Sequence, residues 1–205
     1  MSRYTELKEK FNAYWQKSLS TNEDLFAKMS IEDLVGLKKA VSNVNNILTL
    51  QTTNAFIKML RDDNRISSQH CADVLNEVDS THANTNGFDV ESNNPDFKFV
   101  AEVKCNIPVE ESAFGAAQED GIVKDIRALL ESEKTSKVSK EEIGEYYKFM
   151  VLLDVERVQE SAKRLISKLA KRKKNPIPNI ELYEAGVQLR KDIAYIAFVK
   201  PEINE

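Results

Sequence analysis

Two carboxylates and a lysine near the middle of the chain have residue types suited to metal-dependent hydrolysis. Asp89 is followed, after a gap of twelve residues, by the triplet Glu102-Val103-Lys104. Two convergent carboxylates repel each other, and a hard divalent cation that prefers oxygen ligands relieves this repulsion. Mg²⁺ held in this way keeps several waters and accepts phosphate oxygens, and a nearby lysine can orient or deprotonate the attacking water. These residue types therefore point to hydrolysis at phosphorus.

The triplet alone carries little information, because the pattern acid-x-lysine occurs three times in this chain. Glu6-Leu7-Lys8 lies in an expected helix. Asp96-Phe97-Lys98 lies at an expected turn, too close to Asp89 to leave room for a hairpin. Only Glu102-Val103-Lys104 follows a full expected strand and has an acid on the strand before it. Whether this triplet belongs to a functional site therefore depends on how the two strands are paired.

Two segments of alternating polarity predict a β-hairpin at this place. Residues 88–91 and 97–105 alternate between apolar and polar, and residues 92–96 between them are rich in Asn and Pro. Pro108 ends the second strand because proline cannot donate a hydrogen bond to a sheet.

The phase of the hairpin decides whether the charged residues meet. Glu102 and Lys104 share one face of the second strand, and the phenylalanines of that strand share the other face. If the hairpin turns Phe88 and Val90 toward the phenylalanines, Asp89 joins the two charged residues. Between two carboxylates the pKa of Lys104 is expected to rise.

The other elements alternate between helices and strands along the chain. This order predicts an α/β fold with a mixed sheet, antiparallel at the hairpin and parallel where a helix crosses over. Helices are expected at residues 4–19, 30–39, 42–61, 116–131 and 156–174, and further strands at 146–154 and 192–199.

This arrangement resembles the PD-(D/E)XK nuclease superfamily, which includes most type II restriction endonucleases. The resemblance is carried by Gly87-Phe88-Asp89-Val90 and by Glu102-Val103-Lys104 after an apolar strand. The family core is a helix, three antiparallel strands, a helix and a strand, and the elements expected between residues 42 and 155 follow that order. The resemblance implies a restriction-endonuclease-like core, a mixed β-sheet flanked by helices, in residues 41–205, after an N-terminal helical segment in residues 1–40.

The resemblance also implies roles for individual residues. Asp89, Glu102 and the backbone carbonyl of Val103 would bind Mg²⁺, with Mn²⁺ able to substitute, and Lys104 would act on the attacking water. Many members add a glutamate from the first helical region, and Glu77 is the best-placed candidate here. The implied activity is Mg²⁺-dependent hydrolysis of DNA by an endonuclease, as in a type II restriction enzyme. Cutting both strands with one site per chain implies a homodimer.

Further residues are candidates for contact with DNA. RecB-like members carry a glutamine-led motif on the helix that follows the triplet; Gln118 lies near that place, but Ile122 stands where the motif has tyrosine. Residues 163–174 hold seven basic residues and no acid, which indicates a phosphate-binding surface. The alternative is a solvated helix whose cations lie near its C-terminus, where the helix dipole favours them. The candidates in this segment are Lys168, Lys171, Arg172, Lys173 and Lys174.

The composition and the motifs that are missing indicate the general class of protein. The chain has 205 residues, of which 41% are hydrophobic and 30% charged, with a formal net charge of −4. Cys71 and Cys105 form no CxxC pair, no leader is evident, and no run approaches the roughly 18 apolar residues of a membrane span. Gly115 and Gly121 fit no phosphate-binding glycine loop. We expect a soluble cytoplasmic protein with neither a membrane partner nor a nucleotide cofactor.

Two alternatives to an enzyme stay open. The same fold without metal chemistry could bind DNA or a partner through the basic segment. In a structural protein the hairpin charges would be solvated, and the N-terminal helices would carry the function. The apolar stripe on the first helix, a packing stripe or a dimer surface, consists of Leu7, Phe11, Tyr14 and Trp15.

Overall fold

The computed structural model describes residues 1–80, 87–108, 113–132 and 138–202. The chain divides into two compact units, Met1–Asn45 and Asn46–Glu205, and each is described by itself.

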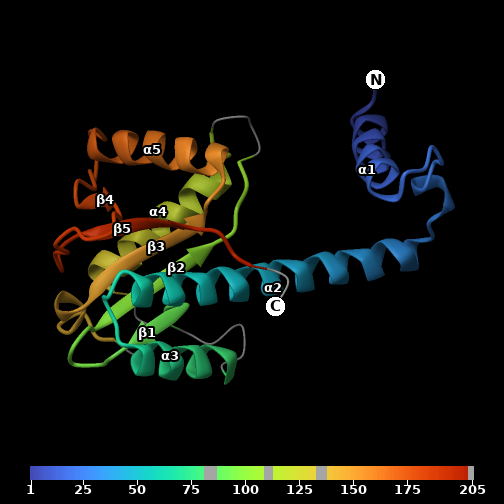
Figure 1. Cartoon of the computed structure of the whole chain (residues 1–205). Coiled ribbons are helices and arrows are strands. Elements are labelled where there is room, and N and C mark those ends of the chain that lie inside the picture. Colours follow the sequence, from blue (N-terminus) through green and yellow to red (C-terminus); the bar gives the residue numbers. More distant parts are fainter. Residues whose placement is uncertain (81–86, 109–112, 133–137, 203–205) are drawn as a thin grey trace. The chain divides into compact units, whose positions relative to one another are not determined.

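A five-stranded mixed sheet forms the centre of the second unit (Figure 1). Its strand order is β1-β2-β3-β5-β4; β1 is antiparallel to β2, and all other neighbours are parallel. The predicted α/β class with a mixed sheet is confirmed. Within the described residues the antiparallel part has two strands, one fewer than the family core implies. The strands are β1 (Val90–Ser92), β2 (Phe99–Lys104), β3 (Tyr147–Leu153), β4 (Ile180–Leu182) and β5 (Ala194–Val199).

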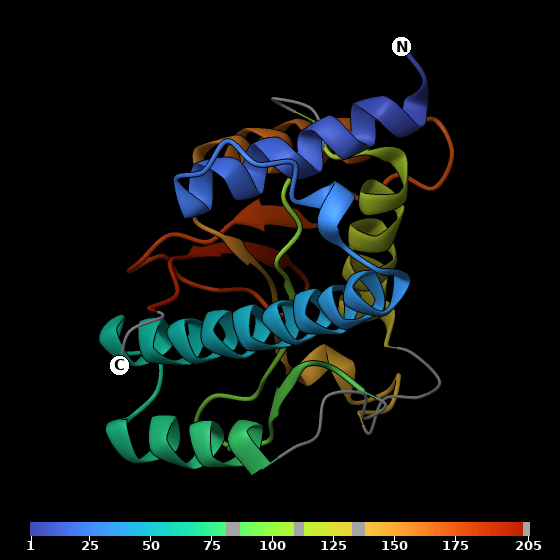
Figure 2. The ribbon, with the colours of Figure 1, turned by 90° about the vertical axis from the view of Figure 1, so that its right-hand side faces the viewer.

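Helices cover both faces of this sheet. On one face lie α4 (Ala116–Glu131), which connects β2 to β3, and α5 (Glu156–Ala170), which follows β3. The other face is covered by α3 (Ser68–Ser80) and by the C-terminal part of α2 (Ile31–Asp62), which lie side by side in Figures 1 and 2. The short helix η2 (Ile143–Glu145) leads into β3.

Alternation along β2 and β3 sends side chains into two separate cores. Val100 and Met150 pack with the helices α4 and α5, whereas Phe99 and Phe149 pack with α2 and α3. Because both faces are covered, β3 is a nearly continuous apolar strand, as parallel strands commonly are. The exception in that strand is Lys148, which is 2% exposed.

The helix break that we expected after Lys39 is absent, since α2 runs without interruption from Ile31 to Asp62. The predicted start is correct: Ser30 Oγ accepts from the Asp33 N–H at 3.1 Å, and Asp33 Oδ2 accepts from the Ser30 N–H at 2.9 Å. The two predicted helices, 30–39 and 42–61, are one helix, because Ala40 and Val41 between them contain no glycine or proline that would end it.

The expected helix at 156–174 ends early, at Ala170. The Ile177 N–H donates to the Leu169 carbonyl at 3.2 Å, and Asn175, which precedes a proline, takes a left-handed conformation with φ 51°. Proline disfavours helical backbone at the residue before it, so no helix continues through Asn175. The helix itself ends five residues earlier, and the basic residues 171–174 follow it instead of extending it. We did not predict α3 and β4 from the sequence, nor the short helices at Phe26–Lys28 and Ile143–Glu145.

The first unit is helical. It contains α1 (Arg3–Leu19), as predicted, the short helix η1 (Phe26–Lys28) and the beginning of α2. The ring of Phe26 contacts those of Tyr4 and Phe11 edge to face, at centroid distances of 6.1 and 5.4 Å. No residue of Met1–Asn45 is fully buried. Across the described residues, every helix is too short or too polar to span a bilayer.

Candidate active site

Asp89 lies across from Glu102 at the start of the hairpin. The antiparallel register pairs Val90 with Ala101, and Asp89 immediately precedes Val90. The backbone N–H of Val103 donates to Asp89 Oδ2 at 2.8 Å, which fixes the carboxylate against β2. The structure thus brings Asp89 and Glu102 together, but Asp89 precedes β1 and does not belong to it as we expected.

The hairpin phase is correct at Val90 and wrong at Phe88. Val90 packs in the core that holds Phe97 and Phe99, whereas Phe88 packs against the opposite core, beneath α4 and α5. Regular alternation fails because β1 begins only at Val90 and the chain bends at Gly87 and Asp89. The contact of Asp89 with β2 comes from its own hydrogen bond.

Glu102 is half-buried, whereas Asp89 is largely exposed, and the two carboxyl groups share a hydrogen bond in which Glu102 donates to Asp89. Burial and the negative charges of Asp89 and Asp125 raise the pKa of Glu102 to about 8. Burial also raises the pKa of Asp89, although the Val103 N–H and Lys104 act in the opposite direction. At neutral pH this pair holds a proton that ordinary carboxyl groups would have lost.

Lys104 contacts a third acid that the sequence did not suggest to us. Its Nζ lies 2.9 Å from Oδ2 of Asp125, whose side chain is 15% exposed on α4. Burial disfavours the charged form of Lys104, but Asp125 and the carboxyl pair outweigh that effect and raise its pKa, as expected. Asp125 stands three residues after Ile122 and four before Leu129, both buried. An acid on the apolar face of a helix was the available clue.

The donor set suits a hard divalent cation. Two adjacent carboxyl groups that keep a proton because of burial and mutual repulsion would exchange it for a metal ion, and oxygen ligands favour Mg²⁺ or Mn²⁺. Among the described residues, no group of three or more His, Cys, Asp or Glu side chains has the spacing of a metal site. Any ion here would depend on Asp89, Glu102, a backbone carbonyl such as that of Val103, and water.

No family model, curated protein or solved structure matches this chain.

Two further sequence candidates lie on α3 and α4. Glu77 is exposed near the end of α3, the helix that covers the face of the sheet holding Ala101 and Val103. Gln118 is part of the helix cap: its Oε1 accepts from the Gly115 N–H at 3.0 Å, and its Nε2 donates to the Ile107 carbonyl at 2.9 Å. Both ends of Gln118 therefore have partners within the protein.

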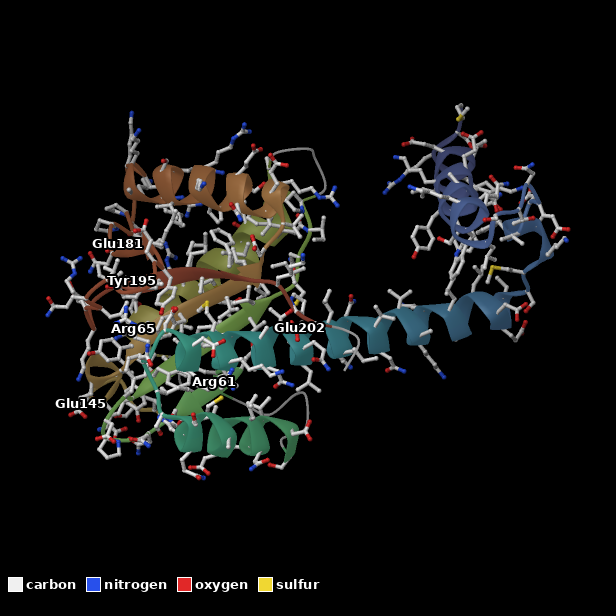
Figure 3. The ribbon with its side chains drawn as sticks, viewed as in Figure 1. Arg61, Arg65, Glu145, Glu181, Tyr195 and Glu202 are labelled. Carbon is white, nitrogen blue, oxygen red and sulfur yellow. The ribbon has the colours of Figure 1, made fainter. Side chains whose placement is uncertain are left out.

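The basic segment lies where the parallel strands of the sheet begin, at their N-terminal ends. In Figure 3, Glu145 marks the side of the sheet where β3 begins, and Glu202 marks the side where β5 ends. Residues 171–174 lie between the end of α5 and the start of β4, on the side where the parallel strands begin. Lys104 is the last residue of β2, on the side where they end. Lys168, on the last turn of α5, pairs with Glu119. The structure separates these cations from the carboxyl pair.

Another buried cation lines a separate cavity of about 980 Å³. Lys148 Nζ donates to the carbonyls of Ile143 and Tyr146, both at 2.8 Å, and to that of Lys191. Burial lowers its pKa to about 8. Since three carbonyls accept its three N–H groups, Lys148 joins η2 to the start of β3 and has no donor left for a ligand.

Proposed function

We propose that this chain is a Mg²⁺-dependent endonuclease that hydrolyses phosphodiester bonds in DNA, with the restriction-endonuclease-like fold of the PD-(D/E)XK superfamily. The observation that carries the proposal is geometric: Asp89, held by the Val103 N–H at 2.8 Å, lies across from the half-buried Glu102, beside the ion pair of Lys104 with Asp125 where β2 ends. Placing like charges together costs stability, and a metal site explains why a protein would keep them.

Each residue of the cluster has a separate role in this proposal. Asp89 and Glu102 would hold the ion, together with the Val103 carbonyl. Bound Mg²⁺ supplies an activated water and neutralises charge at phosphorus. Lys104 stays an ammonium because of its raised pKa, so it orients the attacking water and meets developing negative charge instead of removing a proton.

Asp125 positions this lysine. With its carboxylate 2.9 Å from Nζ, it holds the ammonium at the end of β2 while the carboxyl pair lies on the same side of the sheet. A lysine side chain has four rotatable bonds, so a fixed partner reduces the number of positions that the charge takes up.

The proposal is tested by incubating mixed plasmid DNA with the protein, with and without Mg²⁺, and in parallel with Mn²⁺. Metal-dependent fragments are expected: discrete bands indicate a type II restriction enzyme, and a smear indicates a non-specific nuclease. Asp89→Ala and Lys104→Ala should abolish the cutting. Parent protein that leaves DNA intact under all conditions, or variants that cut as well as the parent, would sink the proposal.

A non-catalytic nucleic-acid-binding module is the second candidate. It is favoured by the exposed cations Lys171, Lys173 and Lys174, which lie far from the carboxyl pair and need no metal. This candidate predicts retention of DNA that weakens steeply with salt and does not require Mg²⁺, and it predicts no cleavage.

A further inference from the structure

The beginning of α2 presents an apolar seam with the spacing of a coiled coil. Leu34, Leu37, Val41 and Val44 follow one another at intervals of three, four and three residues, the a and d positions of two heptads. We define these four residues as the α2 seam. Val41 and Val44 are 51% and 58% exposed, and Leu34 and Leu37 are half-buried.

The unit that carries the seam has no core of its own. None of its 45 residues is fully buried, and its exposed apolar side chains include Ile31 at 71% and Val35 at 50%. Helical stability in proteins comes mainly from burying an apolar face, and a segment this small rarely achieves that alone. A second surface is therefore needed to cover the seam.

The charges beside the seam suit a second copy of the same helix. Asp33 occupies the g position and Lys38 the following e position. In a parallel, in-register pair, g of one helix faces the e position five residues later on its partner. Asp33 of each copy would then face Lys38 of the other, twice over by symmetry.

Helix α1 offers no comparable surface, although Tyr4, Leu7, Phe11 and Tyr14 have the same spacing. Tyr4 and Phe11 already contact Phe26. Apart from Trp15, the positions that flank this stripe hold cations, so pairing two copies of α1 would place Arg3 of one copy beside Lys8 of the other. The flanking cations are Arg3, Lys8, Lys10 and Lys17.

We propose that two copies of this chain associate through the α2 seam as a parallel, two-stranded coiled coil. The partner is a second identical chain, and the contact requires neither metal nor DNA. The proposal does not depend on the nuclease assignment, because no residue of the carboxyl cluster takes part in it.

Light scattering after gel filtration, over a wide range of protein concentration, tests the association. We expect twice the chain mass of 23.3 kDa at high concentration and dissociation on dilution. Val41→Glu, which places a charge at an a position, should raise the dimer dissociation constant by at least about tenfold. The matched control is Val35→Glu, at an outward b position of the same helix with nearly the same exposure, and it should leave the constant unchanged.

The charge pairing has its own control. Lys38→Glu should weaken the dimer, whereas Lys39→Glu, one residue later and outside the seam, should not, and the difference should shrink at high salt. Circular dichroism verifies that all four variants remain folded.

Val44→Cys should form a disulfide between copies under mild oxidation, since d positions face each other in a parallel pair, and Val35→Cys should not. A monomer at every concentration would overturn the proposal and would mean that another surface covers the seam. Equal effects of Val41→Glu and Val35→Glu would overturn it too.

Discussion

The two ends of β2 present the same pattern, a lysine two residues after an acid, in different surroundings. Lys98 stands just before the strand, and its Nζ lies 2.6 Å from Glu145, whose side chain is 60% exposed. Lys104 ends the strand, and its Nζ lies 2.9 Å from Asp125, whose side chain is 15% exposed. The two lysine side chains themselves are 29% and 31% exposed, so they differ in their partners and hardly in their own burial.

The difference shows what a functional cluster requires. An ion pair in water contributes little and is screened by salt, and the pair of Lys98 with Glu145 has that character. At the other end, three acids surround one lysine, and the pKa of Glu102 is raised to about 8. The pattern is common to both ends, and what distinguishes them is the convergence of three acids, of which Glu102 and Asp125 are partly buried.

The largest predicted effect is on catalysis. Lys104→Ala should lower the rate of Mg²⁺-dependent DNA cleavage by at least about a hundredfold, the usual loss on removing a group that acts on the nucleophile. Lys98→Ala, at a side chain of matched exposure, should keep the parent rate. Initial rates of plasmid cleavage at saturating Mg²⁺ measure both, and equal losses would erase the distinction between the two ends.

The second prediction concerns stability against pH without metal. The pKa of Glu102 is raised to about 8 in the folded protein, so between pH 4.5 and 8 the folded state binds more protons than the unfolded state. The free energy of unfolding should therefore fall as pH rises through this window, by an amount on the order of a few kcal/mol, and level off above it.

Glu102→Gln should flatten this dependence and make the metal-free protein more stable than its parent above pH 8, as measured by urea unfolding. Glu145→Gln is the control and should leave the profile unchanged. If the free energy of unfolding of the parent protein does not change between pH 4.5 and 8, the raised pKa of Glu102 is contradicted.

The third prediction concerns the role of Asp125 in positioning Lys104. Asp125→Asn should lower kcat by about tenfold and leave KM for DNA unchanged, because the lysine stays present but loses its fixed place. Asp125→Glu should restore part of the rate. The comparison variant is Asp120→Asn, an exposed acid on the same helix, and a loss of the same size there would contradict the assignment.

The smallest effect is expected at the other end of the strand. Removing the partner of Lys98 by Glu145→Ala should leave the thermal unfolding midpoint and the cleavage rate within experimental error. A clear loss of activity would show that residues where the parallel strands begin take part in the function.

Local patterns were sufficient for part of the fold. The helix at Ala116–Glu131 has the bounds expected from its apolar positions, and β3 differs by one residue at each end, because both segments have strong periodicity or continuous apolar runs. The alternation of β2 placed Glu102 and Lys104 on one face, and the register at Val90 agrees. These features depend on neighbours in sequence.

The rest depended on contacts between distant residues. Asp125 meets Lys104 only because α4 packs on β2, and no spacing in the sequence encodes that crossing. Asp89 reaches β2 through a hydrogen bond formed where the chain bends, so strand alternation could not establish its place. The helices predicted at 30–39 and 42–61 are one continuous helix, and α5 ends where the Ile177 N–H, eight residues further on, donates to the Leu169 carbonyl.

The most direct test of the central claim is calorimetric titration of the protein with Mg²⁺ at pH 7, repeated in two buffers of different ionisation enthalpy. We predict saturable binding that releases about one proton per site, because Glu102 is protonated at this pH and must lose its proton to ligate the ion. Asp89→Asn should abolish the binding heat, and Asp96→Asn, at the turn before β2, should leave it unchanged. Absence of binding, or binding that survives Asp89→Asn, would contradict the account.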